Sequence, residues 1–337
     1  MNIQHNISLK PFNTFGINVT AKHYTVVSNI DELIKALSLR EYSQKFILGG
    51  GSNMLLTKDI EALVIHVNIR GIQVVKEDDK YVYVKAYAGE NWHDFVLWTL
   101  NHNYGGVENL SLIPGNIGAA PIQNIGAYGV ELKDVFVSCE AVEINTQKTR
   151  TFSAEACQFG YRNSIFKSKL KEQYIIASIT LKLTKTNHSI NTAYGAIKEQ
   201  LSDWGITSPT IQDVSKAVIT IRESKLPNPK ELGNSGSFFK NPVINKQVFD
   251  TLIKKYPDIP HYTISTDKIK IPAGWLIEKA GYKGKRYGDA GVHKKQALVL
   301  INYENATGNE LLQLAEDIQQ AIKIAFDIDL EPEVNIF

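Results

Sequence analysis

The amino-acid sequence predicts an α+β protein with more than one domain. Strand-like runs and amphipathic helical segments mix along the chain without the regular strand-helix-strand rhythm of a parallel α/β fold. The length of 337 residues is enough for two or three domains. The composition changes near Lys225, and the stiff connector predicted at Leu226-Pro227-Asn228-Pro229 places a domain boundary at about residue 222.

The composition is that of an ordinary globular protein, with 43% hydrophobic and 21% charged residues. A net charge of +2 favours neither nucleic acid nor a membrane as partner. The two cysteines, Cys139 and Cys157, match no metal-binding or redox spacing, so we expect reduced thiols and no metal site. Neither an apolar signal region nor a membrane-spanning apolar stretch is found, so we expect a cytoplasmic protein.

Local patterns predict the elements of the first part of the chain. Asn29 is predicted to begin a helix, because Glu32 stands three residues later as in a capping box and apolar residues then recur at helical spacing. A second helix is expected at 91–103, with Gly105 as its C-terminal cap. The strands expected here are 22–28, 46–48, 61–69 and 80–88.

Similar signals predict the elements that follow. Gly281 is expected to close a helix, and Thr307 with Glu310 forms the capping box of another. Gly233–Pro242 is predicted to be a Gly-rich polar loop. The remaining expectations are strands at 134–146, 174–184 and 297–303, helices at 245–256 and 273–280, and an extended tail at 330–337.

The segment 105–129 contains six glycines among 25 residues, and Glu108 is its only charged side chain. Glycine allows backbone N–H groups to approach a ligand closely, so successive amides can bind an anion. One interpretation is therefore a backbone cradle for a phosphate-bearing cofactor. A long loop that packs on itself explains the glycine content equally well.

A second Gly-rich sequence, Gly49-Gly50-Gly51-Ser52-Asn53, directly follows a predicted strand. It is not a Rossmann fingerprint, because Met54 replaces the third glycine and no acidic residue stands near position 70. It is not a P-loop either, since it lacks the Gly-Lys-Ser/Thr sequence. A phosphate-binding loop and a tight turn between strands both remain open.

Three polar residues stand in contexts that favour chemistry. Ser237 follows Gly236, so its backbone can bend toward a ligand, and Arg162 can bind a carboxylate with its planar donor face. Glu333 lies in an apolar tail, where burial would raise its pKa and let it hold a proton. Taken singly, a turn serine, a surface arginine and a solvated glutamate are the more common explanations.

Together, six motifs occur in an order that resembles the UDP-N-acetylenolpyruvoylglucosamine reductase family, flavoenzymes of peptidoglycan precursor synthesis. The resemblance covers nearly the whole chain, and Thr192-Ala193-Tyr194-Gly195 resembles the substrate-covering tyrosine loop of its type I branch. Asn116 departs from the threonine or serine usual there. The motifs are GGGSN at 49–53, IPGNIGAAPIQNIGAYG at 113–129, FGYRNSIFK at 159–167, SGSFFKNP at 235–242, PAGWLIEKAG at 272–281 and LEPEV at 330–334.

The resemblance implies an FAD-binding fold of the vanillyl-alcohol-oxidase type, formed by two α+β subdomains, followed by an α+β substrate-binding domain. The implied divisions are FAD-binding subdomains at 1–70 and 71–221, a substrate domain at 222–325, and a tail at 326–337 that carries Glu333 and returns to the second subdomain. FAD is expected to bind non-covalently. Its expected contacts are Gly49, Gly50, Gly51, Ser52, Asn53, Ile113, Pro114, Gly115, Gly118, Ile122, Asn124, Gly126 and Arg222.

The resemblance also implies a reaction. NADPH reduces FAD, and flavin N5 then delivers hydride to C3 of the enolpyruvyl ether of the UDP-sugar. Ser237 is expected to donate the proton to C2, while Arg162 and Glu333 stabilise the charge that spreads into the adjacent carboxylate. The residues expected to bind the UDP-sugar are Tyr128, Tyr161, Tyr194, Lys225, Asn241, Tyr262, Lys270 and Gln296, with Lys225 suited to the pyrophosphate.

Two other functions are compatible with parts of this pattern. A flavin oxidase of the same fold would act on an alcohol or aldonolactone, but many such enzymes attach FAD through a histidine that residues 49–53 lack. A nucleotide-sugar-binding regulator would need no proton donor, so the joint presence of Ser237, Arg162 and Glu333 argues against it. By analogy with the family, we expect a monomer that binds a small nucleotide-sugar and neither nucleic acid nor membrane.

Overall fold

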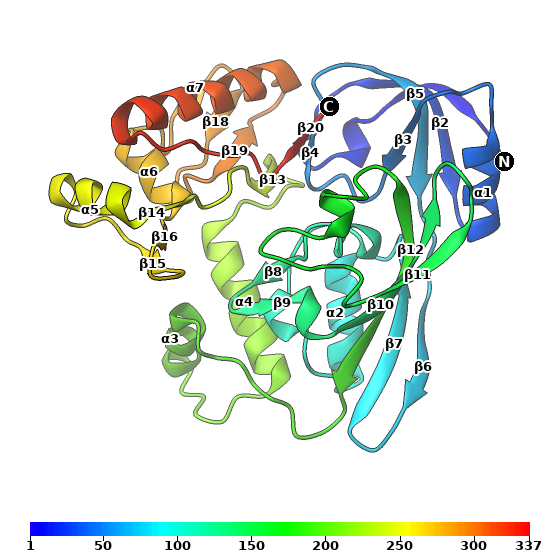
Figure 1. Ribbon diagram of the computed structural model, residues 1–337, viewed down its shortest axis with the longest axis horizontal. Helices are drawn as coiled ribbons and strands as arrows, with labels where there is room; N and C mark the ends of the chain where they lie inside the picture. Colours follow the sequence, from blue (N-terminus) through cyan, green and yellow to red (C-terminus); the bar gives the residue numbers. More distant parts are fainter. The chain divides into compact units, whose positions relative to one another are not determined.

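The computed structural model describes residues 1–337, in which helices and strands mix as the α+β prediction requires (Figure 1). The contacts divide the chain into two compact units. The first unit comprises residues 1–7, 21–50 and 60–224, and the second comprises 8–20, 51–59 and 225–337. The chain passes from the first unit to the second after Ser224, and the domain divisions expected at residues 70, 222 and 326 stay predictions.

In the first unit, a four-stranded sheet has the order β1-β2-β5-β3, with β5 parallel to both β2 and β3. Helix α1 begins as predicted, because the Asn29 side chain accepts from the N–H of Glu32 at 2.8 Å. The carboxylate of Glu32 reaches back to the N–H of Ser28 rather than to Asn29. The bounds are β1 Gln4–Ser8, β2 Thr20–Val27, α1 Ile30–Ser38, β3 Lys45–Leu48 and β5 Ile60–Val67.

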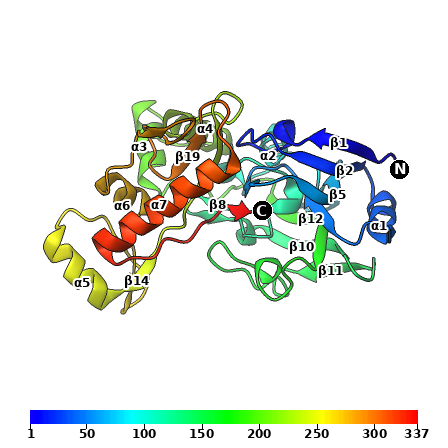
Figure 2. The same cartoon turned by 90° about the horizontal axis from the view of Figure 1, so that it is seen from above.

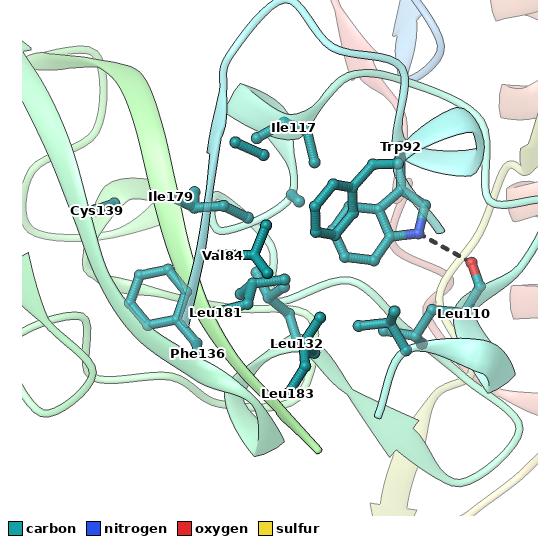
Figure 3. Close-up of a cluster of buried hydrophobic side chains, with 14 of the residues drawn as sticks. Val84, Trp92, Leu110, Ile117, Leu132, Phe136, Cys139, Ile179, Leu181 and Leu183 are labelled. Carbon is teal, nitrogen blue, oxygen red and sulfur yellow. Dashed lines mark hydrogen bonds between the residues drawn. The ribbon is translucent and has the colours of Figure 1, made fainter. Parts of the chain in front are cut away.

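The larger sheet of this unit is five-stranded and antiparallel, in the order β11-β10-β12-β7-β6. Helix α2 packs its aromatic side chains into the core beside it, where Trp92 is 1% exposed (Figure 3). The predicted strand at 134–146 is shorter than expected, and β6 and β11 were not predicted because most of their side chains are exposed. The bounds are β6 Ile72–Glu77, β7 Tyr81–Tyr87, α2 Trp92–Asn101, β10 Phe136–Glu143, β11 Thr149–Ser153 and β12 Tyr174–Thr184.

One expectation in this unit needs correction, and two of its helices were not predicted. Gly105 does not cap α2, because Asn103 takes the left-handed conformation with φ of 55° and Gly105 pairs with Thr184 instead. Residues 185–225 also contain two helices that were not predicted, α3 Gly195–Asp203 and α4 Ile211–Lys225, which pack on each other through a small apolar cluster. The Gly-rich segment forms short 3-10 turns at 108–110 and 117–119 and a small hairpin of β8 Gly126–Ala127 and β9 Val130–Glu131.

The second unit contains a sheet in the order β13-β19-β18-β17, along which the long helix α7 runs (Figure 2). The capping box of Thr307 and Glu310 is confirmed at the start of α7. Residues 233–237 form a strand, so the predicted loop begins later than expected. The bounds are β4 Met54–Leu55, β13 Gly233–Ser237, β14 Val243–Asn245, α5 Lys246–Lys255, β15 Tyr262–Thr263, β16 Lys268–Lys270, α6 Ala273–Lys279, β17 Arg286–Tyr287, β18 Ala290–Val292, β19 Val299–Asn302, α7 Gly308–Phe326 and β20 Asn335–Ile336.

The C-terminal tail is extended, as predicted, and its last residues pair with β4 in the same unit through Asn335 and Met54. Gly281 has a φ of +83° after α6, which confirms it as the residue that ends this helix. None of the helices combines the length and the apolar character that crossing a membrane demands.

Candidate active site

The Gly-rich segment of the first unit is hydrogen-bonded to residues 88–93. The N–H of Trp92 donates to the carbonyl of Gly115 at 2.9 Å, and the indole N–H of Trp92 donates to the carbonyl of Leu110 at 2.9 Å (Figure 3). The N–H of Gly118 donates to the carbonyl of Ala88 at 3.0 Å. Backbone pairing at several points therefore gives this loop a defined shape in place of a regular element.

Close packing explains some of the glycines in the two Gly-rich sequences. A Cβ at Gly118 would lie 2.7 Å from the Cβ of Ala88, and one at Gly50 would lie 2.7 Å from the amide oxygen of Asn116. Around Gly49, in contrast, no protein atom lies within 4 Å of the position that a Cβ would take. Internal packing thus requires glycine at 118 and crowds position 50, and Gly49 is the position whose open side is free for a ligand to approach.

Arg222 on α4 carries an unsatisfied donor in the first unit. Its Nε is buried without a hydrogen-bond partner, and its side chain is hydrogen-bonded to Tyr128. Burial lowers the pKa of the Arg222 guanidinium, and the positive charge of Arg162 nearby acts in the same direction. A phosphate or carbonyl oxygen from a ligand would satisfy this donor, so Arg222 and its surroundings fit an FAD molecule.

Arg162 lies beside the glycine loop of the same unit. It has a φ of 50° in a tight turn closed by Gly160 and Asn163, and its guanidinium donates to the carbonyl of Gly126. Tyr161, whose ring centroid is 5.5 Å from the Arg162 guanidinium carbon, is 50% exposed. The turn therefore presents a cation and an aromatic ring next to the expected cofactor loop.

Side-chain hydrogen bonds connect this turn to the loop. The amide of Asn124, which is 0% exposed, donates to the carbonyl of Gly160 at 3.1 Å and accepts from the N–H of Lys133 at 3.0 Å. The hydroxyl of Ser164 donates to the carbonyl of Ile122 at 2.6 Å. The Asn124 and Ser164 side chains thus hold the Arg162 turn in position.

Tyr128 and Tyr194 are brought together, with ring centroids 5.1 Å apart and planes at 82°. The sequence did not indicate the residues that join their segments. The Asn109 amide donates to the carbonyls of Tyr128 at 3.2 Å and Asn191 at 2.9 Å, and the Asn191 amide donates to the carbonyl of Gly129 at 3.3 Å. An asparagine amide carries two donors, which lets one buried side chain join two loops, but nothing in the local sequence reveals its partners.

In the second unit, Ser237 and Glu333 come from neighbouring segments. The N–H of Glu333 donates to the carbonyl of Phe238 at 2.7 Å, and Phe239 bridges to Pro332. The pairing of β13 with β19 shifts register between Asn234 and Ser237, as in a β-bulge. Glu333 is only partly buried, whereas its place in an apolar tail predicted burial.

Other expected site residues lie in the second unit, and several of them engage local partners. The Asn53 amide donates to the carbonyl of Glu333 at 3.3 Å, and the Asn241 side chain accepts from the N–H of Ala273 at 2.9 Å. Gln296 accepts from the N–H of Leu298. The ammonium of Lys270 is 5.4 Å from the ring centroid of Tyr262. Lys225 is exposed at the end of α4.

The carboxyl group of Glu108 predicts a pH-dependent stability. Glu108 is 2% exposed and accepts from the N–H of Gly106 at 2.6 Å, and burial is the largest influence on its pKa, which is raised. A raised pKa means that the folded state holds this proton more tightly, so the ionised group destabilises the fold as pH rises above the ordinary value of about 4.5. We expect the unfolding free energy of Glu108→Gln, relative to the wild type, to increase on the order of 1 kcal/mol between about pH 4.5 and pH 7.

Urea unfolding at several pH values measures this difference. Glu172→Gln, the same change at an exposed glutamate, is the control. A Glu108→Gln difference that stays constant, or that decreases with rising pH, would contradict the assignment.

Family models match both parts of the chain. Residues 21–152 match the FAD binding domain, and residues 228–337 match the C-terminal domain of UDP-N-acetylenolpyruvoylglucosamine reductase. The solved structure of UDP-N-acetylenolpyruvylglucosamine reductase from Thermus caldophilus superposes with a TM-score of 0.69 at 23% identity, covering 100% of this chain and 99% of its own. A solvent-stable cholesterol oxidase superposes with a TM-score of 0.51 at 11% identity, covering 98% of this chain and 86% of its own. These similarities confirm the predicted FAD-binding fold of the vanillyl-alcohol-oxidase type.

Curated relatives are similar over their full length. The protein named UDP-N-acetylenolpyruvoylglucosamine reductase in Flavobacterium johnsoniae is 58% identical, with 100% of both chains covered. The one in Amoebophilus asiaticus is 48% identical, covering 100% of this chain and 99% of its own. The chain therefore belongs to the UDP-N-acetylenolpyruvoylglucosamine reductase family of FAD-dependent oxidoreductases.

Proposed function

We propose that this protein uses NADPH and FAD to reduce the enolpyruvyl ether of UDP-N-acetylglucosamine-enolpyruvate to UDP-N-acetylmuramate. The observation that carries the proposal is the apposition of Ser237 and Glu333 on paired segments of the second unit. Backbone pairing places the segments that carry this hydroxyl and this carboxyl group next to each other, and such a pair of groups suits the protonation of one carbon and the binding of the adjacent carboxylate. The reaction belongs to peptidoglycan precursor synthesis in the cytoplasm, and thus to cell-wall biogenesis, cell shape and division.

When FAD is bound, it supplies hydride chemistry, with NADPH as the donor and C3 of the enol ether as the acceptor. Ser237 gives the hydroxyl proton to C2, which completes the saturation of the carbon–carbon double bond. Arg162 binds the substrate carboxylate, into which the charge of the enolate spreads, and a protonated Glu333 donates a hydrogen bond to it. Donors directed at such a developing charge are typically worth ~3–4 kcal/mol each.

The other proposed contacts divide between the cofactor and the nucleotide-sugar. We assign FAD to residues 49–53, to the loop from Ile113 to Gly126 and to Arg222, whose buried Nε needs an acceptor. The exposed rings of Tyr161 and Tyr194 are available to the substrate, and Lys225 to its pyrophosphate. Tyr128, Asn241, Tyr262, Lys270 and Gln296 complete the proposed substrate contacts. We further propose that the protein acts as a monomer.

An anaerobic absorbance experiment tests the proposal. The purified protein is expected to show flavin bands that bleach on addition of NADPH and return on addition of UDP-N-acetylglucosamine-enolpyruvate. Bleaching by NADPH without return of the flavin bands would contradict the proposed substrate. Yellow colour that stays with the denatured chain would indicate covalent flavin, as in many oxidases of this fold. Absence of flavin even after FAD is added would favour a nucleotide-sugar-binding protein.

A further inference from the structure

The start of the expected flavin loop has an unfavourable backbone conformation. Leu112 has a φ of 59°, in the left-handed region that side chains such as leucine rarely adopt. It directly precedes Ile113 and Pro114, the first residues assigned to the cofactor. Neighbouring contacts must therefore hold this conformation, and the bonds of Trp92 to Leu110 and Gly115 do so on either side of it.

At Leu112 itself, the backbone N–H donates to Nδ1 of His93 at 3.0 Å. A backbone N–H can only donate, so Nδ1 must carry a lone pair and the imidazole proton must reside on Nε2. An imidazolium ion has protons on both nitrogens and cannot accept this bond. The contact between α2 and the loop therefore exists only while His93 is neutral.

Charged groups around His93 shift its pKa in both directions. Burial lowers its pKa, and the Arg222 guanidinium on α4 lowers it as well, while Asp94 on α2 and Glu223 on α4 raise it; the net pKa is below the usual 6.5. A lowered histidine pKa means that the fold favours the neutral form. The bond from Leu112 to His93 is therefore complete at neutral pH. It is lost as the pH falls through the pKa of His93 in the folded protein, which lies below 6.5.

We propose that His93 is a positioning residue for the flavin: its neutral Nδ1 holds the Leu112 amide, and thereby sets the loop from Ile113 to Gly126 for FAD binding. This inference rests on the proposal that this loop binds FAD. It assigns to α2 a part in cofactor affinity that needs no contact between His93 and the flavin. Protonation of His93 releases the loop and weakens the binding of FAD.

The dissociation constant of FAD, measured from free flavin fluorescence on serial dilution of the holoenzyme, tests the proposal between about pH 5 and pH 8. The wild type is expected to lose affinity as pH falls. His93→Ala removes the acceptor, and we expect FAD to bind about three- to tenfold more weakly at pH 8, with no further loss at pH 5. His93→Asn offers an amide oxygen near the position of Nδ1 but cannot titrate, so it is expected to bind nearly as the wild type does at pH 8 and to keep that affinity at pH 5.

His102→Ala is the matched control, because His102 also lies at α2 but its Nδ1 contacts only the carbonyl of Trp98 among backbone groups. It is expected to follow the wild type at every pH. The proposal is overturned if His93→Ala binds FAD as the wild type does, if His93→Asn is as weak as His93→Ala, or if His93→Asn keeps the wild-type pH dependence. A wild type that binds no FAD at any pH would instead contradict the proposed function.

Discussion

Replacing Ser237 with alanine is expected to leave the reduction of bound flavin by NADPH at its normal rate. The reoxidation of that flavin by the enolpyruvyl substrate is expected to slow by about 10²- to 10⁴-fold, the usual contribution of a positioned general acid. The two half-reactions separate because only the second needs a proton at C2. Anaerobic stopped-flow absorbance, with NADPH and substrate added in turn, measures each rate.

The local structure supports this role for Ser237. Gly236 has a φ of +70°, and its N–H donates to the side chain of Asn234 at 3.0 Å, where the register of β13 shifts against β19. A bulge of this kind redirects the side chain that follows it. Ser237 thus has a backbone conformation specified by its neighbours, and the loss of its hydroxyl alone leaves that backbone intact.

Ser235→Ala is the matched control, since Ser235 lies two residues earlier on the same strand. Its buried hydroxyl is 3.3 Å from the hydroxyl of Thr14 and 3.5 Å from the carbonyl of Met54, so its loss is expected to lower stability slightly without changing either half-reaction. If Ser237→Ala reduces the substrate at the wild-type rate, Ser237 is not the proton donor.

Gly51→Ala is expected to destabilise the protein by about 3 kcal/mol or more and to reduce the yield of FAD-loaded protein. Gly51 has a φ of +61°, which costs an alanine roughly 1–2 kcal/mol. Its new Cβ would also lie 1.9 Å from the carbonyl oxygen of Phe12, a backbone atom that cannot move aside as a flexible side chain can. Urea unfolding measures the loss.

Gly49→Ala provides the comparison within the same Gly-rich sequence. No atom lies within 4 Å of its added Cβ, so stability should change by less than about 1 kcal/mol. If the open side of Gly49 faces FAD, this variant is expected to fold normally and to bind FAD more weakly than the wild type. Equal stability of Gly51→Ala and the wild type would show that the loop can rearrange around the new methyl group.

The sequence by itself determined the elements with strong local signals and the family. Asn29 and Thr307 begin helices because capping is decided within one turn of the chain. Gly281 ends a helix because it takes the left-handed conformation that glycine adopts without strain. The motifs around Ser237 and Arg162 are long enough to specify the FAD-dependent family that the comparisons confirm.

Other elements could not be predicted because their stability comes from distant partners. Helix α4 is rich in β-branched residues, which favour strands locally, and it is helical because its apolar face packs against α3. Asn103 replaced Gly105 as the left-handed residue after α2 because Gly105 is needed in a bridge to Thr184. In both cases tertiary contacts outweighed a weaker local preference.

Only the tertiary structure decided how the site residues are held. The pairing of Glu333 with Phe238 beside Ser237, and the bond from Leu112 to His93, join residues whose local sequences contain no sign of each other. The same holds for the glycines. The sequence shows that Gly49, Gly50 and Gly51 are present, but only packing separates the two whose added Cβ would meet neighbouring atoms from the one that faces open space. Local sequence encodes dihedral preference and periodicity, whereas these contacts depend on where the completed fold places each backbone atom.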